Sequence, residues 1–382
     1  MGGRGQHHDR SDQHPEDARR RSAVPRPSGL HAVLRARRRS HATPGQVRRR
    51  RASDPRARSH RRPAQRRGAR RGPRLRRRTD CRPSTFRSPR CGRRRIVKFA
   101  QALIGADPRG WNRIALAAEA AGFDSVAVSD HVVYPSYLDS AYPYTPDGVP
   151  LFSPEEDWPD PWVAIGAMSA VTTRLRFLTN VYVLPLRNPF VVAKAVGTAA
   201  FLSGGRVGLG IGAGWMAEEF ELLEQPFARR GARMDEMVEM LRGLWSGGMV
   251  EHHGEFYDFA PVEMRPAPPE PVPIYVGGHS AAAFRRAAQL GDGWLGVQYP
   301  PEELIAHCRT LARVREESGT ADRPFEIIAS PLAAPTSDLL EELSGEGVTT
   351  ILTSAWMALG EFQPDVDRAV GLVEAFGERF LS

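Results

Sequence analysis

Beyond residue 96, short apolar runs alternate with longer segments in which apolar residues recur every three or four positions. The short runs have the continuous apolar character of strands that are buried on both faces of a parallel sheet. They predict strands at 97–103, 125–129, 176–182, 206–211, 273–277, 294–298, 325–330 and 349–354. A helical pattern separates successive strands, as is typical of βαβ units.

Capping residues mark where several of these helices begin and end. Asn188 can cap a helix that ends before Gly204, and Ser280 can cap another that ends before Gly291. Further helices are predicted at 111–121, 234–245, 301–317 and 365–380. Eight strand–helix units in about 290 residues predict an α/β fold, a (β/α)8 TIM barrel rather than a doubly wound sheet.

Two insertions interrupt the regular spacing of strands and helices. The first, 132–160, lies between the second strand and its helix. The second, 246–272, precedes the fifth strand and is rich in proline, histidine and acidic residues. A segment that follows a barrel strand lies at the C-terminal end of the barrel, where enzymes of this fold carry their active sites. The first insertion is therefore expected beside the active site.

The charge distribution divides the chain near residue 96. Residues 1–95 contain 32 arginines, no lysine and six acidic residues, a net charge of +26, whereas the remainder carries −17. A segment so charged and so poor in apolar residues does not bury enough surface to offset the entropy that folding costs. We therefore expect 1–96 to be a disordered arginine-rich segment and 97–382 to be one barrel domain.

The origin of the arginine-rich segment has one favoured interpretation and two alternatives. The dominance of Arg, Pro, Gly and Ala is typical of GC-rich DNA translated upstream of a true start, which we place near Val97. A nucleic-acid-binding arm is the first alternative, but such arms usually mix lysine with arginine and carry stacking aromatics. A transit peptide is the second, and it usually contains an amphipathic helix.

Composition also narrows the class of protein. The chain contains no run of about 18 apolar residues and no apolar core of a signal peptide, so we expect a cytoplasmic protein without a membrane partner. Cys308 is the only cysteine of the barrel domain, which excludes a disulfide framework and a cysteine zinc site there. His252 and His253 have no second pair of ligands at useful spacing, so no metal is expected.

Polar residues end the second strand, at the position where barrel enzymes place catalytic groups. These residues are Asp130 and His131, and an aspartate beside a histidine can hold the imidazole in one tautomer for proton transfer. We take both as candidate catalytic residues. The alternative is a capping aspartate and a surface histidine.

Three further strand ends carry candidate cofactor-binding residues. The third strand continues through Asn180 and Val181, which indicates a bulge that lines a pocket, although a long barrel edge gives the same pattern. Glycine-rich segments follow the fourth and fifth strands, leaving room for a flat ligand and, before a helix, free amides for a phosphate. These segments are Gly212-Ala213-Gly214 and Gly277-Gly278-His279-Ser280. The alternative for Ser280 is a helix cap without a ligand. The segment Gly212-Ala213-Gly214 lacks the other features of a dinucleotide-binding fingerprint.

The first insertion is rich in aromatic residues, which predict a lid over an apolar substrate site. The members of this group are Tyr134, Tyr137, Tyr142, Tyr144, Phe152 and Trp158. Trp215, which follows the fourth strand, is expected to belong to the same lid. A dimer contact is the alternative for these aromatics.

Three arginines, Arg229, Arg230 and Arg233, surround the start of the long helix. We expect two of them in surface ion pairs and one beside a phosphate or an acidic tail.

With these features in place, the chain resembles the luciferase-like monooxygenase superfamily, in the branch that uses coenzyme F420. The resemblance covers about 97–381. Its most specific stretches are Pro185-Leu186-Arg187-Asn188-Pro189, Leu202-Ser203-Gly204-Gly205-Arg206, Gly212-Ala213-Gly214-Trp215 with Glu218-Glu219-Phe220, Tyr275-Val276-Gly277-Gly278, and Leu290-Gly291-Asp292-Gly293-Trp294.

The resemblance implies a flavin or deazaflavin in the mouth of the barrel. Its ring would pack against the bulge at Asn180-Val181, where the family often has a non-proline cis peptide. Its phosphate would lie at Gly277, Gly278 and Ser280. The resemblance also implies a polarising or proton-transfer role for His131, because a deazaflavin exchanges only hydride and the protein must supply the proton.

One departure concerns the substrate. Sugar-phosphate dehydrogenases of the family place a proton-donating glutamate just after the fourth strand, whereas this chain has Ala213-Gly214-Trp215-Met216. That activity is not expected, and the aromatic lid favours an apolar or conjugated small molecule.

The sequence thus predicts an F420-dependent oxidoreductase that transfers hydride to or from a small organic substrate. The first alternative is an FMN-dependent monooxygenase that uses oxygen and a reductase partner supplying reduced cofactor. The second, from a different class, is a non-catalytic cofactor carrier or a nucleic-acid-binding protein that acts through the basic arm. Members of the family are commonly dimers, so a homodimer is expected.

Overall fold

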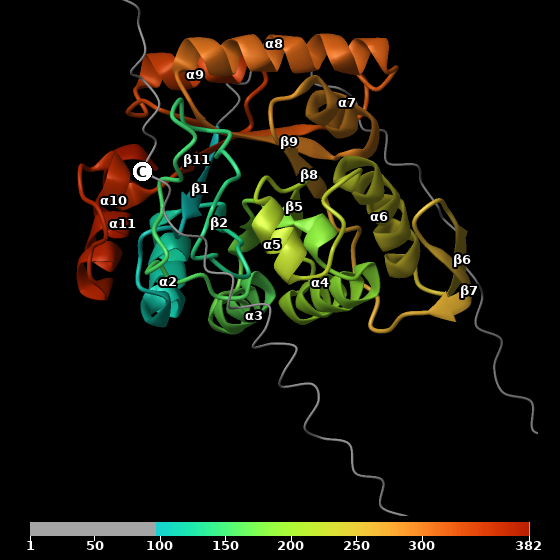
Figure 1. Cartoon of the computed structure of the whole chain (residues 1–382). Helices are drawn as coiled ribbons and strands as arrows, with labels where there is room; N and C mark the ends of the chain where they lie inside the picture. Colours follow the sequence, from blue (N-terminus) through green and yellow to red (C-terminus); the bar gives the residue numbers. More distant parts are fainter. Residues whose placement is uncertain (1–96, 382) are drawn as a thin grey trace, which may run out of the picture. The chain divides into compact units, whose positions relative to one another are not determined.

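Eight parallel strands close into a barrel in the computed structural model, which describes residues 97–381 (Figure 1). The strands are β1 (Lys98–Ala102), β2 (Ser125–Val128), β3 (Arg176–Thr179), β5 (Val207–Gly212), β8 (Ile274–Gly277), β9 (Gly293–Tyr299), β10 (Glu326–Pro331) and β11 (Thr350–Thr353). They follow the order β3-β2-β1-β11-β10-β9-β8-β5, and pairing of Phe177 in β3 with Val207 in β5 closes the ring. The predicted TIM barrel is confirmed, while the expectations for 1–96 lie outside the described residues.

Helices surround the barrel between successive strands (Figure 1). The long ones are α2 (Trp111–Ala121), α3 (Pro161–Val171), α4 (Pro189–Ser203), α6 (Arg230–Trp245), α7 (Ala281–Leu290), α8 (Pro301–Glu317), α9 (Ser337–Gly345) and α11 (Val366–Phe380). The predicted caps are confirmed: the side chain of Asn188 accepts a hydrogen bond from the Phe190 amide, and that of Ser280 accepts one from the Ala283 amide. Short helices α5 (Ala217–Leu222) and α10 (Ala355–Ala358) and the 3-10 turns η1 (Pro108–Gly110) and η2 (Leu184–Leu186) complete the set.

The two insertions differ in structure. Residues 132–160 contain turns and bends but neither helix nor strand. Residues 246–272 form an antiparallel hairpin of β6 (Met249–His253) and β7 (Asp258–Glu263), which lies at the periphery beside α6 (Figure 1). Only the first insertion therefore contributes to the mouth of the barrel.

Polar side chains close the N-terminal end of the barrel. The Tyr275 hydroxyl donates a hydrogen bond to Glu326 at 2.6 Å and accepts one from Arg176 at 3.2 Å. Above this group, the interior is filled by buried apolar residues of six strands, which include Ala100, Leu178 and Leu352. The barrel is thus a packed core with its open end at the C-terminal side. No helix between residues 97 and 381 is long and apolar enough to cross a membrane.

Candidate active site

A cavity of about 710 Å³ opens at the C-terminal end of the barrel, and residues at or just after the ends of all eight barrel strands line it. Most of the residues that the sequence singled out meet here. They are Asp130, His131, Trp158, Asn180, Val181, Gly212, Ala213, Gly214, Trp215, Gly277, Gly278, His279 and Ser280. The cavity also takes in Tyr142, Tyr144 and Phe152 of the first insertion.

The segment after β3 bends into this cavity. The peptide bond between Asn180 and Val181 is cis, at the position that the family resemblance indicated, and the chain then continues as β4 (Tyr182–Val183) along β5. Glycines make room for this bend. A Cβ added at Gly212 would lie 2.6 Å from Val181 Cγ2, and one at Gly277 would lie 2.8 Å from Val181 Cγ1. Gly212 and Gly277 therefore accommodate the Val181 side chain, and both also line the cavity, so the expectation that glycines leave room for a flat ligand stays a prediction.

Asp130 does not orient His131, so the predicted pairing of these neighbours is wrong. The Asp130 carboxylate accepts two hydrogen bonds from the Arg187 guanidinium, at 2.6 and 2.7 Å, and a third from the Val183 amide at 2.9 Å. Its side chain is completely buried, and the Arg187 guanidinium also lies 4.2 Å from the centre of the Tyr182 ring. Adjacent residues point to different sides of an extended chain, and Asp130 faces the β4 segment. It holds the bend after β3 in place.

Glu219 on α5 is the carboxylate that faces His131. Its Oε2 lies 3.3 Å from His131 Nδ1, and its Oε1 accepts hydrogen bonds from the amides of Val132, at 2.6 Å, and Val133, at 3.4 Å. Glu219 is 1% exposed. An ionised carboxylate only accepts hydrogen bonds, so Nδ1 carries the proton and Nε2 is left for a substrate.

The neighbouring Glu218 attaches α5 to the first insertion. It accepts hydrogen bonds from the Asp139 amide at 2.7 Å and the Ser140 amide at 3.0 Å. Although burial opposes ionisation, these amides hold the pKa of Glu218 below its ordinary value. Two consecutive glutamates therefore position the backbone of the insertion, and one of them also orients the histidine.

Aromatic rings enclose His131. The centre of its ring lies 4.9 Å from that of Phe152, 5.0 Å from that of Trp158 and 6.1 Å from that of Trp215. Tyr142 packs on Trp215, and burial raises the pKa of Tyr142 to about 12, so its hydroxyl stays protonated at neutral pH. The side chain of His131 is therefore only 11% exposed.

Two of the predicted lid residues do not line the cavity. Tyr134 packs edge-on against Phe152, with ring centres 6.0 Å apart, and supports the wall from outside. Tyr137 is 69% exposed. The prediction that these two rings cover the substrate is therefore wrong, because the insertion turns its later aromatics inward.

The side of the cavity opposite His131 is cationic. It contains the N-terminus of α7, with its free amides, and the side chains of Arg230 and Arg286. The Arg286 guanidinium is held by Asp235, and that of Arg230 donates to the Gly214 carbonyl at 2.9 Å. Free amides and guanidinium groups together form an anion seat. Arg286 was missed from the sequence, where only its helical spacing from Ser280 could have indicated it.

The other two arginines have different roles. Arg229 forms a surface ion pair with Glu255, as expected for this cluster. Arg233 is buried and donates to the carbonyls of Pro185 and Pro226. Of the two surface ion pairs expected among these three arginines, the described residues therefore form one, that of Arg229.

A hydrogen bond borders the anion seat. His279 Nδ1 lies 2.7 Å from the Tyr299 hydroxyl, and burial keeps the pKa of Tyr299 well above its ordinary value. The neutral hydroxyl is therefore available to the imidazole as a hydrogen-bond donor, and it fixes the position of the His279 ring beside Ser280.

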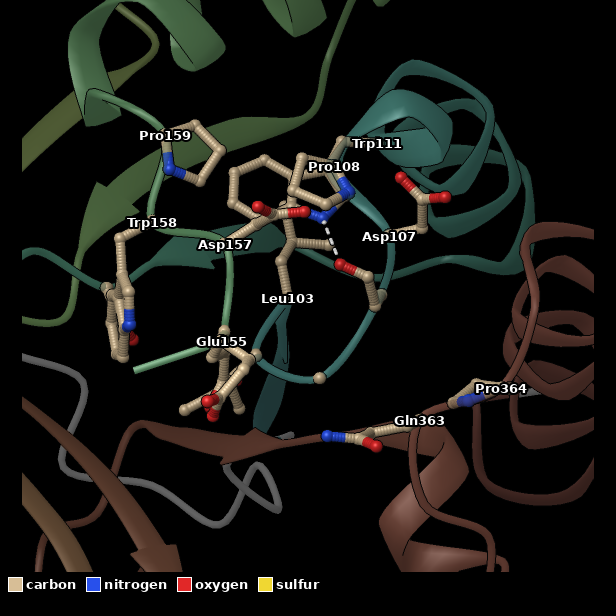
Figure 2. A pocket seen from close by; sticks show the side chains of 15 residues that line it. Leu103, Asp107, Pro108, Trp111, Glu155, Asp157, Trp158, Pro159, Gln363 and Pro364 are labelled. Atoms are coloured by element: carbon tan, nitrogen blue, oxygen red, sulfur yellow. Dashed lines mark hydrogen bonds between the residues drawn. The ribbon is translucent and has the colours of Figure 1, made fainter. Parts of the chain in front are cut away.

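A second pocket, of about 250 Å³, shares Ile104, Ser129 and Trp158 with the cavity (Figure 2). Its other walls are acidic: the lining includes Glu155 and Glu156, and burial raises the pKa of Glu156. The dashed line at Trp111 in Figure 2 is the hydrogen bond that its indole donates to the Ala106 carbonyl, which joins two residues of the pocket lining. The carboxyl groups of this pocket disfavour an anion here, in contrast to the α7 side of the cavity.

Comparison with known proteins agrees with this geometry. A family model described as luciferase-like monooxygenase matches residues 97–344. An uncharacterised protein of Mycobacterium tuberculosis is 44% identical over 67% of this chain and 88% of its own length. The F420-dependent glucose-6-phosphate dehydrogenase of Segniliparus rotundus is 34% identical over 58% of this chain, which spans 64% of that enzyme.

Solved structures show the same fold at low sequence identity. The coenzyme F420-dependent tetrahydromethanopterin reductase of Methanopyrus kandleri matches with a TM-score of 0.58 and 15% identity, over 75% of this chain and 98% of that one. An F420-dependent secondary alcohol dehydrogenase in complex with an F420-acetone adduct matches with a TM-score of 0.58 and 19% identity, over 74% of this chain and 97% of that one. The chain belongs to the luciferase-like monooxygenase family of oxidoreductases.

Proposed function

We propose that this protein is a coenzyme F420-dependent oxidoreductase that transfers hydride to or from a small apolar or conjugated organic substrate. The observation that carries the proposal is a single cavity with an anion seat on one side and the Glu219–His131 pair on the other. Relatives named as F420-dependent support the choice of cofactor. The cofactor supplies a ring carbon that gives or accepts hydride.

The residues of the cavity fit a phosphate-bearing deazaflavin. Asn180 Oδ1 is buried and has no hydrogen-bond partner among the described residues, so it can accept an N–H of a bound ring. Val181 offers an apolar surface to the ring. The α7 amides, Ser280 and Arg230 would hold the phosphate, and this set leaves the His131 side of the cavity for the substrate.

The chain's own residues then supply the proton chemistry. Glu219 keeps the proton on His131 Nδ1, so Nε2 can take a proton from a substrate hydroxyl or, once protonated, return it to a carbonyl oxygen. The rings of Phe152, Trp158 and Trp215 pack around the imidazole and give this nitrogen an apolar surrounding. The stretch directly after β5, Ala213-Gly214-Trp215-Met216, lacks the glutamate that the family resemblance implies for sugar-phosphate dehydrogenases, so that substrate is not proposed.

Cofactor titration tests this proposal. Wild-type protein should bind F420 more tightly than FMN. Intrinsic tryptophan fluorescence measures both affinities, since Trp158 and Trp215 line the cavity. Ser280→Ala should weaken F420 by about tenfold, because a hydrogen bond to a charged phosphate is lost. It should leave the affinity for the same chromophore without its phosphate unchanged.

The matched control is Asp365→Ala, which also removes an N-cap, that of α11, but lies outside the cavity lining. It should leave F420 affinity at the wild-type value. Tighter binding of FMN than F420 would instead indicate an FMN-dependent monooxygenase. Binding of neither cofactor by a folded protein would contradict the proposal.

A separate prediction concerns the orientation of His131. Glu219→Gln should lower kcat about tenfold with unchanged cofactor affinity, because the glutamine amide can donate to Nδ1 and favours the opposite tautomer. Nitrogen-15 NMR of the histidine side chains reads the tautomer directly. Glu218→Gln is the control, because Glu218 contacts Asp139 and Ser140 but not His131. Equal tautomers in wild type and Glu219→Gln would remove Glu219 from the mechanism.

A further inference from the structure

One wall of the cavity is apolar and open to solvent. We call the side chains of Ile104, Leu332, Met357 and Phe362 the apolar wall; they line the cavity and follow β1, β10 and β11. They are respectively 37%, 62%, 45% and 74% exposed. Large apolar side chains that gather at a cavity mouth indicate a ligand that covers them.

This wall carries no charge. Between Leu295 and Phe362, none of the cavity-lining residues has an ionisable side chain. The cationic side chains of the lining, Arg230 and Arg286, lie on the opposite side, at α6 and α7. An anionic substrate would lose water here without gaining a cationic partner, which disfavours its binding along this wall.

The size of the exposed surface also argues against a very small substrate. The apolar wall starts next to the His131 region, because Ile104 and Trp158 border the same second pocket, and it extends to Phe362. A two- or three-carbon molecule that reaches His131 leaves Leu332 and Phe362 in water. A substrate with a longer apolar body covers them and gains their hydrophobic contact.

We propose, building on the proposed function, that the substrate is an uncharged alcohol or ketone carried on an extended apolar body that lies along the apolar wall. In the oxidative direction, a deazaflavin held at the anion seat would supply the acceptor for the hydride of the carbinol C–H bond. The hydroxyl proton goes to His131 Nε2, and the carbon–oxygen double bond forms. The reductive direction reverses each transfer, so electrons and protons balance in both.

The test measures affinity as a function of chain length, independently of turnover. Straight-chain 2-alkanones from 2-butanone to 2-dodecanone displace the neutral dye N-phenyl-1-naphthylamine from the full-length protein, with and without F420. Each added methylene should tighten binding about three- to fourfold, the value for burying one methylene. The double variant Leu332→Ser/Phe362→Ser should flatten this dependence for the long ketones and leave 2-butanone and F420 affinity unchanged.

Leu116→Ser and Met249→Ser are the controls, because these residues are similarly exposed (46% and 72%) but lie outside the cavity lining. Both should keep the wild-type chain-length dependence. Exposed positions change stability little, and thermal unfolding verifies that each variant is folded. An affinity that does not depend on chain length in the wild type, or an unchanged dependence in the double variant, overturns the inference. A retained dependence without F420 binding overturns the proposed cofactor and supports the apolar ligand class.

Discussion

Replacing His131 with alanine should lower kcat by a factor of about 10² to 10⁴, the range for loss of a general acid or base. Its Nε2 is the nitrogen left for the substrate, since Glu219 occupies Nδ1. The affinity for F420 should change little, because the anion seat lies on the opposite side of the cavity. Absorbance of F420 during turnover of the fastest alcohol or ketone gives kcat, and tryptophan fluorescence gives the dissociation constant.

The control for this experiment is His253→Ala. His253 lies in the β6–β7 hairpin, where its side chain is 65% exposed and pairs with Asp258. It should retain wild-type turnover. If His131→Ala also turned over at the wild-type rate, His131 would have no part in proton transfer.

The second large effect is on stability. Arg187→Leu should lower the free energy of unfolding by about 3–5 kcal/mol, because it leaves the Asp130 carboxylate buried without its cationic partner. Urea denaturation of the full-length protein measures the change. Since Asp130 also fixes the Val183 amide, the bend at Asn180-Val181 should be disturbed and cofactor affinity should fall as well.

An exposed pair provides the matched comparison. Arg113 contacts Asp367 at 2.7 Å, but both side chains are mostly in solvent, so Arg113→Leu should cost at most about 1 kcal/mol. Adding Asp130→Leu to Arg187→Leu should recover part of the lost stability, because no unpaired charge then remains buried. Equal effects of Arg187→Leu and Arg113→Leu would mean that the buried pair does not support the barrel mouth.

Much of the fold could be predicted because its signals are local. Continuous apolar runs gave the eight strands, and caps such as Asn188 and Ser280 gave helix starts. Helices α5 and α10 were missed because six and four residues are too few to display a helical period. The general position of the site followed from the rule that barrel enzymes place their residues after the strands.

The partners within the site could not be predicted, because they are distant in the sequence. Glu219 lies 88 positions from His131, and the Glu218-Glu219 pair carried no sign of which loop it would hold. The aspartate next to His131 was a closer candidate, yet its true partner is Arg187, 57 positions away. Proximity along an extended chain is a poor guide to contact, since adjacent side chains diverge.

The hydrogen bonds between α5 and the first insertion have a consequence for how the sequence of this enzyme can diverge. Glu219 contacts the insertion through the main-chain amides of Val132 and Val133, and Glu218 contacts it through those of Asp139 and Ser140. The Ser140 hydroxyl also accepts a hydrogen bond from the Ala217 amide at the start of α5. Every residue type except proline offers such an amide. Apart from Ser140, side chains of the insertion can therefore be exchanged while these contacts to α5 are kept, so we expect the sequence of the insertion to diverge more readily than Glu218 and Glu219.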